Sequence, residues 1–154
     1  MVQLTTFIAA PQQRVFDLSL SMGVHKTSMA RYNETIVKGP GSGLLQLNEQ
    51  VTWKAKHLFK ERLLTVRLCE SKPPFFFADE QVHGDFKMLK HEHYFKPVDN
   101  GTIMIDQFHY SLPYTFVGKL LNRLYLEGYL KKLLMERNAF IKKAAEGNLW
   151  KQYL

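Results

Sequence analysis

Two histidines separated by one residue are the strongest chemical feature of this sequence. His91 and His93 lie in a segment whose residues alternate between polar and apolar character, so both imidazoles share one face of a strand. Lys90, Glu92 and Lys96 occupy the other face, which marks that face as the solvated one. We therefore expect both imidazoles to point toward the concave, interior side of the protein.

Asp106 and Tyr110 join the histidines if the next strand presents the same face. Asp99-Asn100-Gly101 predicts a tight hairpin, and the returning strand at 102–112 carries both residues. A buried carboxylate needs a partner, and a histidine is the expected one. Three roles remain open for this cluster: a polar brace that fixes strand register, the orientation of a bound ligand, and general acid–base catalysis.

A His-x-His pair can also bind a metal ion, but only with at least one further placed ligand. The sequence by itself places none, so we expect no metal ion and no cofactor. The single Cys69 excludes a multi-cysteine metal site and an internal disulfide framework. The glycine-rich loop at 39–43 is not followed by Lys-Ser/Thr, which argues against a nucleotide site.

Aromatic side chains on the predicted strands supply apolar walls for a core or a cavity. The chain has eleven Phe, seven Tyr and two Trp. Asp79 and Gln81 have the parity of two of these phenylalanines and add polar groups to the wall if that face is inward. The aromatic residues expected to line a cavity are Trp53, Phe75, Phe77, Phe95 and Phe108.

The elements that must position these side chains follow from hydrophobic periodicity. After a first strand at 2–9 we expect two short helices, at 12–21 and 24–30. Six further strands are predicted at 32–38, 44–58, 62–69, 75–82, 86–98 and 102–112. A long helix at about 116–146 ends the chain, with Gly128 inside it.

This order predicts an α+β fold built as one domain over residues 1–154. The chain is long enough for one core, and 45% of its residues are hydrophobic. A curved antiparallel sheet of about seven strands has one apolar face, and the terminal helix is the only large element available to cover it. A sheet wrapped around one helix leaves a cavity where the packing side chains do not fill the space.

The sequence resembles the START-like, helix-grip superfamily, also called SRPBCC. The resemblance rests on Phe7–Pro11 with Val15–Asp17, on Phe75-x-x-x-Asp79-x-Gln81-x-x-Gly84, on His91-x-His93-x-Phe95, and on Thr102-x-x-x-Asp106-x-x-x-Tyr110-x-Leu112-Pro113. It covers residues 5 to about 146 and is closest in character to an uncharacterised bacterial ligand-binding subgroup. The resemblance implies the helix-grip fold. It leaves the function open among carriers, cyclases, hydrolases and interaction modules.

The positive charge of the chain is concentrated near its C-terminus. Of a net charge of +7, residues from Val117 onward contribute eight Lys/Arg against three Asp/Glu. We expect the solvated face of the long helix to carry Lys119, Arg123, Lys131, Lys132, Arg137, Lys142 and Lys143. A peripheral contact with an anionic membrane surface through this helix stays open. The inward aromatics argue against nucleic-acid binding.

The most favoured function is binding of a small hydrophobic or amphipathic ligand, lipid- or polyketide-like, between sheet and helix. Trp53 and the phenylalanines would form the walls, and the His, Asp and Tyr side chains would orient the ligand. A cyclase- or dehydratase-type enzyme using the same cluster, and an interaction module with a vestigial cavity, are the alternatives. We lean away from an enzyme. No apolar run is long enough to span a bilayer, so we expect a cytoplasmic protein whose oligomeric state is open.

Overall fold

A computed structural model describes residues 1–113, the backbone of 116–122, and all of 123–154. The helices are α1 (Gln12–Leu20), α2 (Met22–Ser28) and α3 (Phe116–Glu146), with 3-10 turns at Ala30–Tyr32 and Leu149–Gln152. The strands are β1 (Val2–Ile8), β2 (Thr35–Lys38), β3 (Gln50–His57), β4 (Lys60–Lys72), β5 (Phe76–His83), β6 (Met88–Val98) and β7 (Gly101–Ser111).

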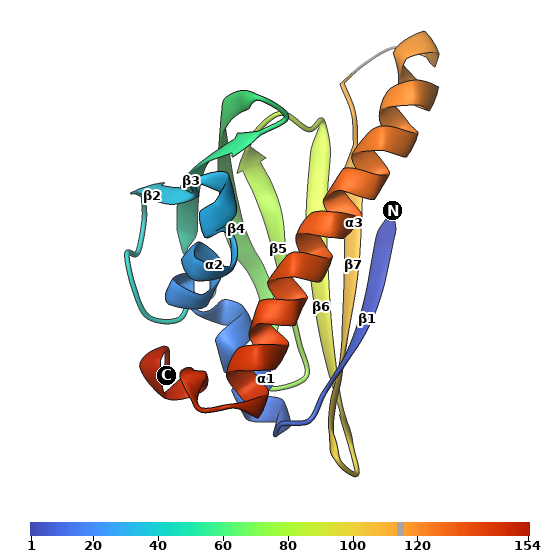
Figure 1. Cartoon of the computed structure of the whole chain (residues 1–154). Coiled ribbons are helices and arrows are strands. Elements are labelled where there is room, and N and C mark those ends of the chain that lie inside the picture. Colours follow the sequence, from blue (N-terminus) through green and yellow to red (C-terminus); the bar gives the residue numbers. More distant parts are fainter. Residues whose placement is uncertain (114–115) are drawn as a thin grey trace.

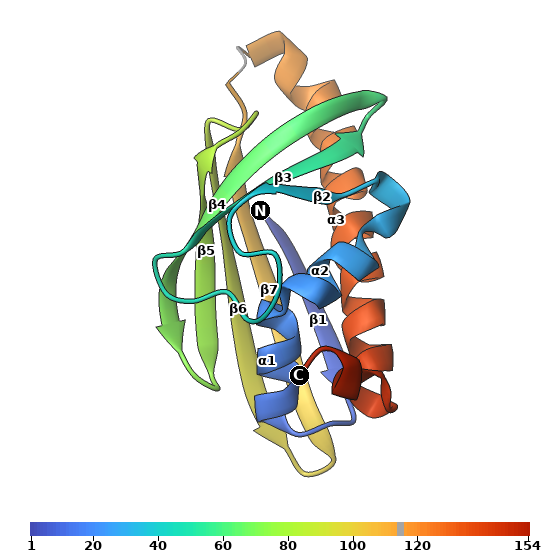
Figure 2. The same ribbon diagram turned by 90° about the vertical axis from the view of Figure 1, so that its left-hand side faces the viewer.

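The strands form one antiparallel sheet of seven strands in the order β1-β7-β6-β5-β4-β3-β2. Consecutive hairpins therefore build the sheet from β2 to β7, and β1 adds to the far edge beside β7. The sheet curves, and α3 runs across its concave side (Figure 1). Seen from the side, the sheet and α3 face each other, with α1 at the lower end of the space between them and α2 above it, toward β2 (Figure 2). This is the α+β helix-grip arrangement expected from the sequence.

The side chains that face α3 follow the alternation read from the sequence. In β3, Val51 and Trp53 are buried, and in β6 His91 and His93 are buried. The register pairs His93 with Asp106 across β6 and β7. Because directly opposite residues share a face, Asp106 points to the same side as the histidines.

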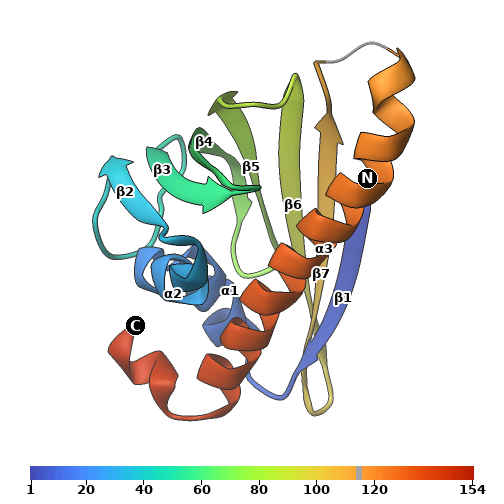
Figure 3. The same ribbon diagram turned by 45° about the horizontal axis from the view of Figure 1, so that its top comes forward.

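The core lies at the end of the molecule where α1 and α2 meet the sheet and the C-terminal half of α3 (Figure 3). Phe16 of α1 packs edge-on against Phe77 and Phe95, with ring centroids 5.6 and 5.3 Å away. Ile141 of α3 is fully buried in the same cluster. This packing fills one end of the space between the sheet and α3. At the other end, side chains line the space without filling it.

Several predicted boundaries are wrong for local reasons. The strand expected at 44–58 begins only at Gln50, because Asn48 adopts a left-handed conformation (φ 67°) that interrupts extended backbone. The strand expected at 32–38 begins at Thr35, after a left-handed Asn33. At Gly128 inside α3, an added Cβ would meet no atom of the described residues within 4 Å, so the sheet makes no close approach to the helix there.

Candidate functional site

A cavity of about 410 Å³ lies between the sheet and α3. Its surface is mostly apolar and comes from strands β3 to β7 and from all three α-helices. Representative wall residues are Val51, Leu64, Val66, Leu68, Leu130 and Leu134. Cavities that bind small molecules have volumes of roughly 300–1,000 Å³ and a mainly apolar lining with a few placed polar groups. The size and lining of this cavity therefore suit a small organic ligand.

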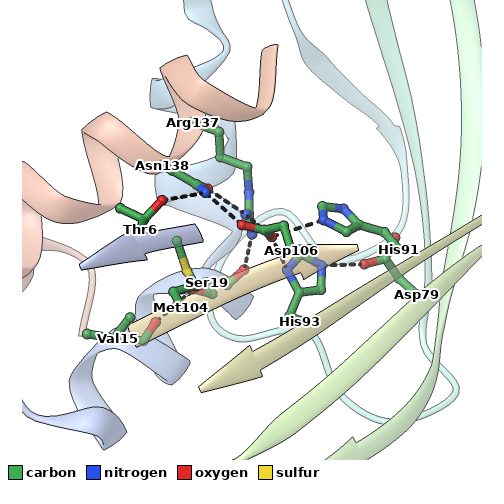
Figure 4. Close-up of polar contacts among 10 residues, drawn as sticks. All are labelled: Thr6, Val15, Ser19, Asp79, His91, His93, Met104, Asp106, Arg137 and Asn138. Atoms are coloured by element: carbon green, nitrogen blue, oxygen red, sulfur yellow. Dashed lines mark hydrogen bonds and ion pairs between the residues drawn. The ribbon is translucent and has the colours of Figure 1, made fainter. Parts of the chain in front are cut away.

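One wall of the cavity carries a buried polar cluster centred on Asp106, which is itself fully buried (Figure 4). Asp106 Oδ1 lies 3.0 Å from Nε2 of His91 and 2.9 Å from Nδ1 of His93. The contact with His91 is a hydrogen bond, whereas the contact with His93 lacks hydrogen-bond alignment. An ionised carboxylate only accepts hydrogen bonds, so His91 donates from Nε2.

His93 connects this cluster to Asp79 on the neighbouring strand β5. Its Nε2 lies 3.1 Å from Asp79 Oδ2 and forms a hydrogen bond with it. The His93 imidazole is also stacked on the Phe77 ring, with centroids 4.1 Å apart. The Asp79 side chain keeps 20% of its surface exposed and, like both histidines, lines the cavity. The cluster thus presents a carboxylate and two imidazoles to the cavity.

Two side chains of α3 complete the cluster from the opposite layer. Asn138 donates from Nδ2 to Asp106 Oδ2 at 2.6 Å and to Thr6 Oγ1 at 3.2 Å. The Arg137 guanidinium lies 3.6 Å from Asp106 Oδ1 and donates to the main-chain oxygen of Ser19 at 3.2 Å. The buried carboxylate is therefore compensated by groups from both the sheet and the helix.

The electrostatics of the cluster keep its carboxylates ionised. Burial would raise the pKa of Asp106, but the hydrogen bond from His91 and the proximity of His93 hold that pKa well below its usual range. Burial also opposes the ionised form of Asp79, but the hydrogen bond from His93 and the charge interactions with His91, His93 and Arg137 together lower the pKa. Burial, reinforced by the neighbouring His93, lowers the pKa of His91 to about 4. His91 is therefore neutral at pH 7.

The structure brings together most of the residues singled out in the sequence. The residues among them that line the cavity are Trp53, Phe77, His91, His93 and Phe108. Asp106 lies behind the two histidines and holds them. Trp53 is stacked on His25, with ring centroids 4.3 Å apart, and His25 in turn contacts Glu34 at 2.9 Å.

Three of the expected ligand-contacting residues lie elsewhere. Phe75 is 57% exposed, because it lies in the turn that follows Pro73-Pro74 and β5 begins only after it. Phe95 is buried in the core beside Phe16 rather than on the cavity wall. Tyr110 packs against Phe86 and Phe108 and is not part of the His–Asp cluster, so the expected His–Asp–Tyr group is a His–Asp group.

Arg137 is the main residue that sequence reasoning misplaced. It was assigned to the solvated basic face of the long helix, but it is only 8% exposed and reaches the polar cluster. A signal was present in the sequence, since Leu130, Leu134, Arg137 and Ile141 follow the spacing of one helical stripe, and all four are buried. Asn138 lies next to this stripe and is also buried, although its polar side chain by itself predicts a solvated position. The side chain of Lys119 lies outside the described residues.

The cluster also contains the set of donor groups that a metal site requires. One ligand atom each of Asp79, His91 and His93 lies within 4.8 Å of the other two. The sequence placed two of these three donors on one strand, and the pairing of β5 with β6 supplies the third, because Asp79 lies opposite His91.

Comparisons with known proteins identify the fold. No protein-family model matches the chain, and no curated protein matches it. The Zhui aromatase/cyclase from Streptomyces sp. R1128 has a TM-score of 0.74 at 14% identity, over 94% of this chain and 92% of that one. The protein TTHA0849 from Thermus thermophilus has a TM-score of 0.69 at 19% identity, over 94% and 98%. Ara h 8.0201 has a TM-score of 0.64 at 8% identity, over 90% and 95%.

These likenesses show that the chain shares its fold with these proteins, which is the helix-grip arrangement that the sequence resemblance implied. Within the described residues, none of the helices combines the length and the apolar character needed to cross a lipid bilayer.

Proposed function

We propose that this protein binds a small hydrophobic or amphipathic molecule, lipid- or polyketide-like, in the cavity between the sheet and α3. The observation that carries the proposal is the cavity itself, about 410 Å³ in volume and mainly apolar, with a polar cluster on one wall. Apolar walls give affinity for the body of a ligand, while Asp79, His91 and His93 offer hydrogen bonds to one polar end. An interaction module with a vestigial cavity fits this open interior less well.

An enzyme of cyclase or dehydratase type is the second candidate. Asp79 and His93 form a hydrogen-bonded carboxylate–imidazole pair on the cavity wall, which is the arrangement used for general acid–base catalysis. The name of the aromatase/cyclase that shares the fold is in keeping with this candidate. An enzyme would lose turnover on Asp79→Asn while keeping ligand affinity within a few-fold, whereas a carrier has no turnover to lose.

The second part of the proposal concerns a peripheral contact with an anionic membrane surface, from which an amphipathic ligand could be exchanged. The N-terminal half of α3 exposes Arg123 together with Leu124 and Tyr125, which are 70% and 66% exposed. Tyr125 also lines the cavity. Exposed apolar and cationic side chains beside a cavity are the combination that favours an anionic bilayer surface.

Ligand binding is tested by filling the cavity from α3. Leu133→Trp replaces an aliphatic side chain of the cavity wall with a bulky indole ring. Leu124→Trp makes the same change on the same helix at an exposed position. We expect Leu133→Trp to weaken binding of an environment-sensitive fluorescent fatty-acid probe at least tenfold, about 1.4 kcal/mol. Leu124→Trp should bind it as the wild type does. The measurements are made in EDTA, so that metal ions do not contribute.

Native mass spectrometry of the protein purified from its own host identifies the natural ligand by mass. A co-purified small molecule that is present in wild type and Leu124→Trp, and lost from Leu133→Trp, would support the proposal. Equal probe affinity in all three proteins, with no co-purified molecule, would contradict it.

A further inference from the structure

We propose that Asp79, His91 and His93 bind a divalent first-row transition metal ion, of which Zn²⁺ is the reference case, on the cavity wall. Two imidazole nitrogens and one carboxylate oxygen are a donor set that binds Zn²⁺ and Fe²⁺ in proteins, with remaining positions left for water or a ligand. The inference stands on these three side chains and does not depend on an organic ligand.

The positions of the donors support a shared ion. Their ligand atoms lie within 4.8 Å of one another, and side-chain rotations would have to shorten these separations to the roughly 3.3 Å between neighbouring ligands of a tetrahedral zinc ion. His91 and His93 share one face of β6, with ring centroids 3.7 Å apart, and Asp79 approaches them from β5. The residues come from the middle of paired strands, which hold their backbone positions fixed.

Asp106 supplies the support that metal-binding histidines need. Metal-bound imidazoles almost always donate a hydrogen bond from the N–H of their second ring nitrogen to a carboxylate or a carbonyl group. This hydrogen bond fixes the tautomer and the ring orientation. Asp106 Oδ1 already accepts from Nε2 of His91, which leaves Nδ1 of that ring unprotonated in the neutral form. The same oxygen lies 2.9 Å from Nδ1 of His93.

Besides the side-chain rotations, metal binding requires one proton to move within the His93 ring. In the metal-free cluster His93 donates from Nε2 to Asp79, and its buried Nδ1 has no aligned hydrogen-bond partner among the described residues. Moving that proton from Nε2 to Nδ1 directs it at Asp106 and frees Nε2, beside the Asp79 carboxylate, for the ion. The rotations that bring the donors together would also have to align this N–H with Asp106, which would give Nδ1 a hydrogen-bond partner.

The charges around the site would be balanced if the bound metal ion also held one anionic ligand. The two carboxylates offset a divalent ion, and Arg137, 3.6 Å from Asp106, leaves one excess positive charge. Asp79, His91 and His93 all line the cavity, so the open coordination positions face the space in which a ligand would lie. Hydroxide, or a carboxylate or enolate oxygen of a ligand, would neutralise the site.

Cobalt titration tests the site directly. Untagged protein is stripped with EDTA, transferred to metal-free buffer and titrated with Co²⁺, whose visible absorption reports coordination by the protein. We expect one equivalent to bind with a Kd on the order of 10 µM or tighter, and Zn²⁺ to displace it. Saturating Zn²⁺ should raise the thermal midpoint by roughly 5 °C.

Matched variants locate the ion. Asp79→Asn keeps the side-chain shape and should weaken Co²⁺ binding at least a hundredfold, while His109→Gln, on the outer face beside Glu92, should have no effect. Asp79→Cys should restore binding and add a thiolate-to-cobalt absorption band in the near ultraviolet. The wild type should lack that band, because the Cys69 thiol donates a hydrogen bond to the carbonyl oxygen of Ala78 and is not one of the three grouped donor side chains.

Failure of the wild type to bind Co²⁺ or Zn²⁺ would overturn the inference. Equal binding by Asp79→Asn, or an Asp79→Cys protein that binds without the thiolate band, would overturn it as well. Because ligand binding is measured in EDTA on Leu133→Trp, a failed metal site leaves the proposed ligand function standing, and a failed ligand site leaves the metal site standing.

Discussion

Asp106 is the residue on which the polar cluster depends. A fully buried carboxylate costs several kcal/mol unless it is paired and hydrogen-bonded. Here two imidazoles approach one oxygen, Asn138 bonds the other, and Arg137 adds a positive charge. The sequence predicted the histidine partners on the condition that strand 102–112 presents the same face as His91 and His93, and the register of β6 and β7 meets that condition. It could not rank a structural brace above a functional site, since both use the same contacts.

The lowered pKa of His91 makes the stability of the metal-free protein depend on pH. This pKa is about 4 in the folded state and near 6.5 when unfolded. Between these values the unfolded state binds more protons, so the free energy of unfolding falls as pH drops from 6.5 to 4. Below pH 4, protonation of Asp79 and Asp106 against their lowered pKa values continues the loss.

Urea unfolding in EDTA at pH 7 and pH 4.5 measures this effect. We expect the wild type to lose roughly 1–3 kcal/mol from His91 over that interval. His91→Gln should lose correspondingly less, while His109→Gln should behave as the wild type. A pH dependence that is the same in His91→Gln and wild type would show that His91 titrates alike in both states.

At the scale of elements, alternation along strands was predictable and the ends of elements were not. The inward faces of β3, β6 and β7 follow period two, because burial on one side of a sheet imposes that period. Phe75 was placed inward by extending the same period beyond the first residue of β5, where the backbone turns. The charge of Arg137 predicts an outward side chain, whereas its position on the buried stripe of α3 predicts an inward one, and the position decides.

The β6–β7 hairpin makes a close approach to the end of β1 at Gly101. A Cβ at this position would overlap the carbonyl oxygen of Ile8 and lie 2.9 Å from the Cα of Ala9. We expect Gly101→Ala to destabilise the protein by roughly 1–3 kcal/mol in urea unfolding, because backbone atoms must move. Gly41→Ala, where a Cβ would meet no atom within 4 Å, should change stability by less than about 0.5 kcal/mol. Equal effects of the two substitutions would show that the approach is not tight.

Over the whole molecule, the sheet layer and the helix layer differ in how their charges are compensated. The outer face of the sheet pairs many of its charges, as in the contacts of Arg67 with Glu80 and of Lys90 with Glu70. The helix layer carries most of the excess positive charge, although Arg137 is used inside the protein. A surface contact that is driven by charge is therefore expected on the α3 side.

Vesicle co-sedimentation tests that expectation. We expect the protein to bind vesicles that contain phosphatidylserine and to be released at about 0.5 M salt, since each surface Lys contributes roughly 1 kcal/mol and is screened by salt. Lys131→Glu/Lys132→Glu on α3 should reduce binding about tenfold or more. Lys54→Glu/Lys56→Glu, the same charge change on exposed residues of β3, should not. Equal losses in the two double variants would assign the binding to net charge rather than to α3.

The sequence by itself determined the order of elements and the inward direction of His91 and His93, because these follow from local periodicity and hairpin signals. It left the direction of Asp106 conditional, because residues 102–112 are apolar on both faces. Only the tertiary structure decided that the interior is open, that Asp79 meets the histidines, and that Arg137 and Asn138 reach Asp106 from α3. The physical reason is that a cavity and a cluster depend on strand register and on the placement of α3 across the curved sheet. Those are contacts between residues far apart in the chain, which no local pattern encodes.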